Sequence, residues 1–468
     1  MAKVKFKGDR ILWGAIVLLM LLSVVFVYTS SSSLAFQNND GNTIATLFDQ
    51  FIKVAGAVVV LYVVQSIPWR MWYKYAPYLL VIAIVLLLLV KVFGVEINGA
   101  KRWLKIPIIG LPFQPSEFAK IAIIVHLSRV LSDFQIKEGF WLKGLSKWGH
   151  KEFGLVIITI VLIFLENFST SFIISVVVFI MLILGRVSFT FLLKLFVPLG
   201  ILFVLFLQIG RVYEPIGSIG RVKTINSRID NFFKSDDSAD KKLSYDKEDF
   251  QSIQAKVAIM KGGLTGEGVG NSTQRNYLPY CYSDFIFAII VEELGLVGVL
   301  IIFFLFMILL FRSIVTANKY LVIEDKNEFG GPTLFVPLMI IGLISSLIIQ
   351  ALFHIGVNSG IFPVTGQTLP FISHGGTSLW ISSIGIGIII GASYRITPEG
   401  QNDPYNPGEF IERILQRFRR TEPSYRQRRQ DMINSVKDDF DENFNDKNTS
   451  DGYTDRFSSE YDDDFDEN

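Results

Sequence analysis

Ten runs of apolar residues recur along this 468-residue chain, and they limit its fold more than any other feature. Most reach about 18 residues, the length that an α-helix needs to cross the hydrocarbon core of a bilayer. Half of the residues are hydrophobic. We therefore predict an all-α, polytopic membrane protein with about ten transmembrane helices. The runs cover residues 11–28, 46–65, 76–94, 116–131, 154–166, 170–186, 189–209, 284–312, 333–353 and 374–394.

Basic residues indicate the orientation of these helices, because short loops rich in Lys and Arg stay in the cytoplasm. The N-terminus is basic, and the first run lacks a small-residue cleavage site after it, which indicates a retained helix rather than a signal peptide. We expect both termini in the cytoplasm. Outside the cell membrane we expect a large loop at 210–283 and a short one at 95–115. Three further outward connections lack Lys and Arg: 29–45, 167–169 and 354–373.

The membrane domain ends near residue 395, and residues 396–468 form a cytoplasmic tail of different composition. Phe410, Ile414 and Phe418 form an apolar stripe at helical spacing among several arginines. This pattern predicts a short amphipathic helix on the anionic inner leaflet, although a charged linker would have the same composition. From Asp431 onward the tail is acidic and poor in aliphatic residues, so we expect disorder.

A carboxylate, Asp284, stands at the start of the eighth apolar run, after the glycine-rich stretch GGLTGEGVGNSTQ. An acid at the edge of a membrane helix is costly and is a functional candidate. It could cap the helix that follows, or a raised pKa could make it a general base. Glu292 and Glu293 lie at least two turns deeper. We interpret them as a buried pair held by a cation or by backbone groups.

One group of charged residues precedes the fourth run, and a second group lies at its start. Arg102, beside Lys101 in the 95–115 loop, lies where an external polyanionic group could meet it. Glu117 and Lys120 are three residues apart and can pair on one helix face. Such a pair either neutralises itself within the bundle or belongs to a binding site.

Two segments rich in glycine leave both a functional and a structural interpretation open. Residues 262–270 and 354–378 could cradle a phosphate or a sugar with backbone N–H groups, or could simply pack between helices. The chain has one cysteine, Cys281, which excludes an internal disulfide, and four histidines without metal-ligand spacing. We predict no metal-ligand cluster and no nucleic-acid partner.

Several separated motifs, in order, resemble those of the SEDS family, the group of FtsW, RodA and SpoVE. They are NGAKRW with QPSEFAK, GEGVGNSTQ with SDFIFAIIVEELGLVG, and PVTGQTLPFISHGGTS. The resemblance spans nearly all ten runs. It implies a peptidoglycan glycosyltransferase that polymerises lipid II onto an undecaprenyl-pyrophosphate-linked glycan at the outer face of the inner membrane. It also implies a partner, a class B penicillin-binding protein that cross-links the strands.

The resemblance assigns residues as well. It implies that Asp284 is the catalytic base, while a Mg²⁺ or Mn²⁺ ion could assist the leaving group. The substrate-binding residues that we predict are Lys101, Arg102, Glu117, Lys120, Arg221, Arg228, Gln274, Thr365 and Ser373. The chain departs from the family pattern at four positions: Asn167 replaces an acid, His354 an Asn, His374 a Tyr, and Tyr280 an acid.

The GNSTQ motif and the long charged tail favour the FtsW branch, hence a role with other divisome proteins at the division septum. A RodA-like role in elongation remains an alternative. Two other functions would use similar features: a flippase that moves lipid II, which also needs intramembrane charges, and a non-catalytic scaffold of the divisome.

Overall fold

The computed structural model describes residues 8–31, 43–97, 100–105, 112–138, 149–212, 247–278, 281–325 and 334–396. The chain divides into two compact units, Met1–Asn406 and Pro407–Asn468, and every described residue belongs to the first. The amphipathic helix and the acidic segment predicted for the tail lie outside the described residues and stay predictions.

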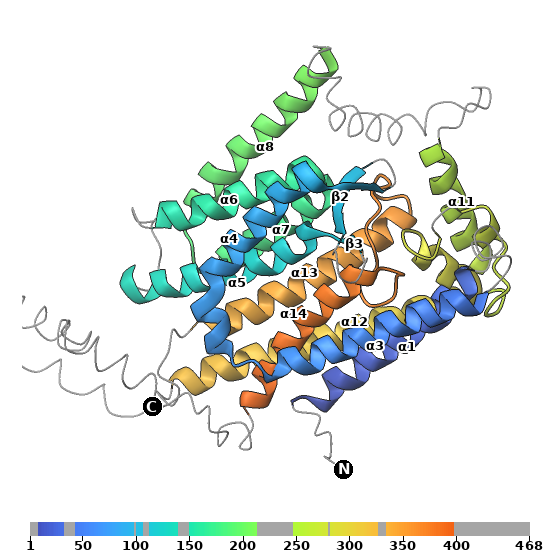
Figure 1. Cartoon of the computed structure of the whole chain (residues 1–468), viewed down its shortest axis with the longest axis horizontal. Coiled ribbons are helices and arrows are strands. Elements are labelled where there is room, and N and C mark those ends of the chain that lie inside the picture. Colours follow the sequence, from blue (N-terminus) through green and yellow to red (C-terminus); the bar gives the residue numbers. More distant parts are fainter. Residues whose placement is uncertain are drawn as a thin grey trace, which may run out of the picture. The chain divides into compact units, whose positions relative to one another are not determined.

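Each predicted apolar run overlaps a helix of its own within the described part of the chain (Figure 1). Where the sequence has start signals, they are used: the Asp9 side chain accepts from Ile11 N at 2.9 Å, and Pro115 opens its helix. Asn167, which replaces an acid of the family pattern, caps the following helix by accepting from Thr170 N. The helices are α1 (Arg10–Ser30), α3 (Thr43–Ser66), α4 (Trp69–Phe93), α5 (Pro115–Glu138), α6 (Gly149–Glu166), α7 (Phe168–Leu184), α8 (Phe189–Val212), α12 (Ile286–Asp325), α13 (Phe335–Asn358) and α14 (Gly376–Arg395).

Six of these helices, α1, α3, α4, α12, α13 and α14, are long and apolar enough to cross a membrane, and α7 and the start of α8 are shorter apolar helices. Large apolar side chains stand exposed on them, such as Phe51 on α3, Val92 on α4 and Phe304 on α12. Surfaces of this kind are stable against lipid and unfavourable in water. The protein is an all-α, multi-pass membrane protein, as predicted.

Two stretches that were predicted to be loops contain secondary structure. In 95–115 a small antiparallel sheet has the strand order β1 (Val95–Ile97), β2 (Ala100–Lys105), β3 (Pro112–Phe113). In 210–283 there is a helix, α11 (Lys247–Gly262), and a 3₁₀ turn, η1 (Gln274–Asn276). The sheet, α11 and the connection between α13 and α14 lie toward one end of the helix bundle (Figure 1).

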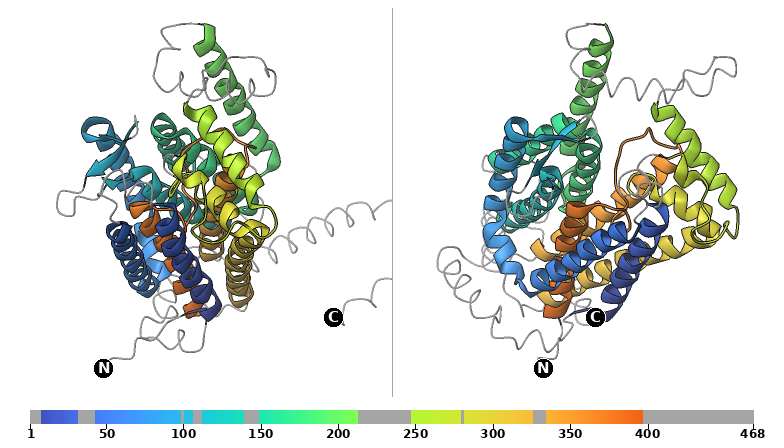
Figure 2. Two further views of the ribbon diagram at one scale, coloured as in Figure 1. Left: turned by 90° about the vertical axis from the view of Figure 1, so that its right-hand side faces the viewer. Right: turned by 45° about the vertical axis from the view of Figure 1, so that its right-hand side comes forward.

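Helices α3 and α14 lie side by side, and their backbones approach closely (Figure 2). A Cβ at Gly391 would lie 2.6 Å from the Gln65 carbonyl oxygen, and one at Gly387 would lie 2.9 Å from Val64 Cγ1. Trp380 on α14 donates from Nε1 to the carbonyl of Lys53 on α3 at 2.9 Å, so a side chain also links the two helices. Small residues at such contacts are the usual means of close helix packing in membranes.

The helix α12 is interrupted at Gly295, whose φ of 64° and ψ of −152° are not helical. The interruption leaves the carbonyls of Glu292 and Glu293 to accept from Glu267 N and Gly268 N, both at 2.9 Å. Leu296 N donates to the carbonyl of Gly263 at 3.1 Å. The glycine-rich segment 263–270 therefore replaces the missing helical partners, as buried backbone groups require.

Close approach explains a glycine in this segment. A Cβ at Gly266 would lie 2.2 Å from the Glu293 carbonyl oxygen, and its φ is 78°. Of the two interpretations left open for residues 262–270, packing against α12 is the one that these contacts support.

Two alanine substitutions separate backbone strain from steric overlap. Gly266 and Gly270 have similar φ values, 78° and 83°, but a Cβ at Gly270 meets nothing within 4 Å. Both variants bear the cost of a left-handed alanine, about 1–2 kcal/mol. We expect Gly266→Ala to lose about 1–3 kcal/mol more, because the added methyl overlaps the α12 backbone. Thermal unfolding in detergent measures the difference, and equal losses would contradict the docking of this segment.

Candidate active site

Asp284 lies in the turn that leads into α12, with its side chain partly exposed. Its Oδ1 accepts a hydrogen bond of 2.9 Å from Ser283 Oγ. Gly366, in the loop 359–375 between α13 and α14, approaches from the other side: a Cβ there would lie 3.3 Å from Asp284 Oδ2. Because Gly366 has no side chain and a φ of 67°, the loop backbone reaches the carboxylate and leaves it accessible.

The last residue of α13, Asn358, joins the start of α12 to this turn. Its Oδ1 accepts from Ala288 N at 3.1 Å, which satisfies one N–H of the first helical turn. Its Nδ2 donates to the carbonyls of Asp284, at 3.1 Å, and His354, at 2.9 Å. The Asn358 side chain therefore contributes from another helix to capping the start of α12.

Two further contacts attach the loop 359–375 to the turn. Ser373 Oγ donates to the Ser283 carbonyl at 2.7 Å and accepts from Leu369 N at 2.7 Å. His374 N donates to the Tyr282 carbonyl at 2.9 Å. Ser373, predicted to bind substrate, is buried and engaged with protein groups, so its observed contacts position the backbone beside Asp284.

The middle of the same loop is held by buried polar side chains of α7 and α13. Gln367 donates from Nε2 to Thr170 Oγ1 at 3.0 Å, and its carbonyl lies 2.7 Å from His354 Nδ1. A carbonyl only accepts, so Nδ1 carries the proton of His354. Thr365, another predicted binding residue, is buried, and its hydroxyl has no hydrogen-bond partner among the described residues.

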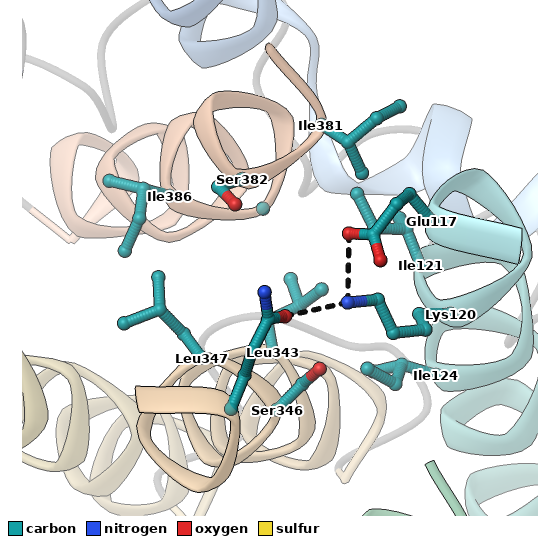
Figure 3. Close-up of a pocket in the computed structure, with 12 residues that line it drawn as sticks. Glu117, Lys120, Ile121, Ile124, Leu343, Ser346, Leu347, Ile381, Ser382 and Ile386 are labelled. Atoms are coloured by element: carbon teal, nitrogen blue, oxygen red, sulfur yellow. Dashed lines mark hydrogen bonds and ion pairs between the residues drawn. The ribbon is translucent and has the colours of Figure 1, made fainter. Parts of the chain in front are cut away.

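Glu117 and Lys120 form a buried ion pair on α5, with 2.9 Å between Glu117 Oε2 and Lys120 Nζ. The ammonium also donates to Gln350 Oε1 on α13 at 2.7 Å. Both charged residues line a pocket between α5, α13 and α14, and the remaining lining is mainly apolar (Figure 3). The predicted pairing is confirmed, and it is linked to a second helix.

The predicted cations are only partly described. Lys101 and Arg102 are on β2, which contacts α5. In the strand register, the backbone of Lys101 lies opposite that of Glu96 on β1. The Arg102 side chain is half-buried. Arg221 and Arg228 lie outside the described residues, so their predicted place beside the pyrophosphate stays a prediction.

Glu292 is fully buried and holds the GNSTQ segment. Its carboxylate accepts from Ser272 Oγ, from Thr273 N at 3.1 Å and from Gln274 N at 3.2 Å, with Lys261 Nζ at 3.8 Å. The interpretation of Glu292 as a structural carboxylate, met by a cation and by backbone groups, is confirmed. Gln274, predicted to bind substrate, is held here through its backbone.

Sequence reasoning missed a cluster around His374. Ser23 Oγ donates to the Ile372 carbonyl at 2.8 Å, so it accepts from Gln50 Nε2 at 2.7 Å. Because Nε2 of the Gln50 amide points to Ser23, its Oε1 faces His374 Nδ1, at 3.0 Å. Nδ1 therefore carries the proton, and Nε2 accepts from the Lys53 ammonium at 3.0 Å. The only signal in the sequence was that His374 departs from the family pattern.

His374 is uncharged in this arrangement. Burial, followed by the charge of Lys53, lowers the pKa of His374 from 6.5 to about 4, although Asp49 opposes the shift. Lys53 Nζ also lies 2.5 Å from Asp49 Oδ2, which compensates the ammonium. The cluster therefore holds His374, the residue that follows Ser373, in place with its imidazole neutral.

A partly exposed carboxylate on a hydrogen-bonded turn, at one end of a bundle of membrane helices, gives this multi-pass membrane protein a candidate active site. The family model FTSW_RODA_SPOVE, described as "Cell cycle protein", matches residues 9–397. The chain belongs to this family.

Relatives named for peptidoglycan synthesis or sporulation resemble most of the chain. The probable peptidoglycan glycosyltransferase FtsW of Hydrogenovibrio crunogenus is 31% identical over 82% of this chain and 90% of its own. The peptidoglycan glycosyltransferase MrdB of Escherichia coli K12 is 32% identical over 80% and 91%. Stage V sporulation protein E of Bacillus subtilis is 30% identical over 83% and 98%.

Solved structures share the fold. A chain of a peptidoglycan synthase complex, described as coordinating polymerization and crosslinking, has a TM-score of 0.59 and 23% identity, covering 84% of this chain and 99% of its own. The rod shape determining protein RodA of Thermus thermophilus has a TM-score of 0.53 and 22% identity, covering 83% and 97%.

The lowered pKa of His374 predicts a pH dependence of stability. Between about pH 6.5 and pH 4, the unfolded chain binds a proton at this residue that the folded protein excludes. Stability therefore falls as pH drops through this window. We expect the melting temperature of the wild type to fall more on acidification than that of His374→Gln, which keeps a hydrogen-bonding side chain without this titration. Parallel pH profiles for the two proteins would show that His374 does not contribute.

Proposed function

We propose that this protein is a peptidoglycan glycosyltransferase, which polymerises lipid II into glycan strands at the outer face of the cytoplasmic membrane. The observation that carries the proposal is the accessible carboxylate of Asp284 on a turn braced by Asn358 and Ser373. Membership of the family supports it, as do relatives named for this activity over about four-fifths of the chain.

In the proposed reaction, the sugar hydroxyl of lipid II attacks the anomeric carbon of the growing strand. A glycosidic bond forms, the bond to undecaprenyl pyrophosphate breaks, and the hydroxyl proton passes to Asp284. The braced turn suits a general base, because its carboxylate keeps one position while the substrate arrives. Arg102, with Lys101, Arg221 or Arg228, would stabilise the charge on the leaving pyrophosphate, for which a planar guanidinium is well suited.

We infer a division role for this chain, with a class B penicillin-binding protein as the partner that cross-links its strands. The GNSTQ segment and several relatives named FtsW support division. The relative named MrdB is as similar, so the elongation role is the alternative. A structural neighbour described as part of a peptidoglycan synthase complex supports the partner. In this proposal both termini are cytoplasmic and the protein collects at the septum.

A lipid II flippase is a second candidate, favoured by one observation. The Glu117–Lys120 pair faces a pocket between helices, and intramembrane charges of this kind also occur on transport pathways. Purified protein in liposomes discriminates the two functions. Formation of polymer from lipid II supports the polymerase, whereas translocation of lipid II without polymer supports the flippase.

Substitution of Asp284 tests the base. We expect Asp284→Asn and Asp284→Ala to lower kcat for lipid II polymerisation by about 10²–10⁴, the usual contribution of general base catalysis. The assay should contain the partner transpeptidase.

Glu267→Gln is the matched control, because Glu267 is an exposed acid of the segment 263–270 and contacts α12 through its backbone. Melting curves of every variant identify loss of folding. Polymerisation by both Asp284 variants at the wild-type rate would show that another group takes the proton.

A further inference from the structure

Gln350 lies at the centre of a polar connection that crosses the bundle. It is buried on α13, one end of its amide accepts from Lys120 Nζ at 2.7 Å, and the other donates from Nε2 to the Thr368 carbonyl at 3.0 Å. An ammonium only donates and a carbonyl only accepts, so the orientation of the amide is fixed. The ion pair on α5 is therefore linked through one side chain to the loop 359–375.

The linked part of the loop is the part that meets Asp284. Thr368 follows Gly366 by two residues, and a Cβ at Gly366 would lie 3.3 Å from Asp284 Oδ2. Further along, Thr368 Oγ1 lies 3.1 Å from Ser378 Oγ at the start of α14. The Gln350 contact thus holds the backbone between Gly366, which approaches the carboxylate, and the next helix.

We propose that Gln350 is a positioning residue for the transfer reaction: it holds the loop 359–375 against Asp284 and relates the loop position to the Glu117–Lys120 pair. The inference rests on the proposed function. Gln350 does not touch the reacting atoms, and it acts through the Thr368 carbonyl. The expected effect is on kcat, because Gln350 acts on the loop through the Thr368 carbonyl, close to the base.

The chemistry of the amide offers a sharp substitution. Gln350→Glu has nearly the same shape and keeps an oxygen for Lys120, but it places a second acceptor against the Thr368 carbonyl. The contact with the ion pair remains, while the contact with the loop becomes repulsive. Gln350→Met removes both contacts and keeps a similar volume. Gln254→Glu, on α11, makes the same chemical change at a half-buried residue outside the connection and is the matched control.

The experiment measures lipid II polymerisation by the full-length protein with its partner transpeptidase. We expect kcat of Gln350→Glu to fall by about tenfold or more, near the effect of one lost hydrogen bond, with KM for lipid II changed less than about twofold. Gln254→Glu should match the wild type. Hydrogen exchange, measured on the same proteins without substrate, should rise in residues 363–375 of Gln350→Glu and remain unchanged in residues 263–278.

The two readouts separate the possible failures. If wild-type protein makes polymer, and Gln350→Glu has wild-type kcat or unchanged exchange in residues 363–375, the inference is wrong. A rise in exchange over the whole chain would indicate general destabilisation, which also overturns it. If wild-type protein makes no polymer, the proposed function fails, whereas a local rise in exchange would still demonstrate the attachment of the loop by Gln350.

Discussion

The interruption of α12 at Gly295 is the constraint on which the end of the bundle that carries Asp284 depends. A membrane helix must satisfy its backbone groups internally, and an interrupted one needs partners from elsewhere in the protein. The segment 263–270 supplies them to the carbonyls of Glu292 and Glu293, and the Glu292 carboxylate then binds residues 272–274. Contacts around one break in one helix therefore hold residues 263–274, which precede the candidate base.

Length and apolarity were sufficient to locate ten helices in the described part of the chain, six of which are long and apolar enough to cross a membrane, because such a segment needs little information beyond its own residues. The sheet was missed because its strands are short and gain stability by pairing with one another. The helix α11 has low hydrophobicity along its length, and Ala255 and Ala258 are buried by residues from α12 and from the segment before it, such as Leu278 and Phe285. Elements stabilised by distant partners leave a weak signal in the local sequence.

The candidate site was predictable at Asp284 and at the Glu117–Lys120 pair, since a charge at a membrane boundary is conspicuous by its cost. The residues that support Asp284 and the ion pair could not be predicted from the sequence. Asn358, Gln350 and His374 acquire their roles from groups in other helices and loops, often by orienting an amide or an imidazole. Such roles depend on three-dimensional distances, and a polar residue within an apolar run does not reveal which group it will meet.

The close contact between α3 and α14 has a consequence for the route of a lipid substrate. Two helices can admit a prenyl chain between them only if their backbones separate, and here Gly391 packs directly on the Gln65 carbonyl. Separation would also break the bond from Trp380 to the Lys53 carbonyl. If the protein acts on a lipid as proposed, the close contact of α3 with α14 implies that the lipid enters along another side of the bundle.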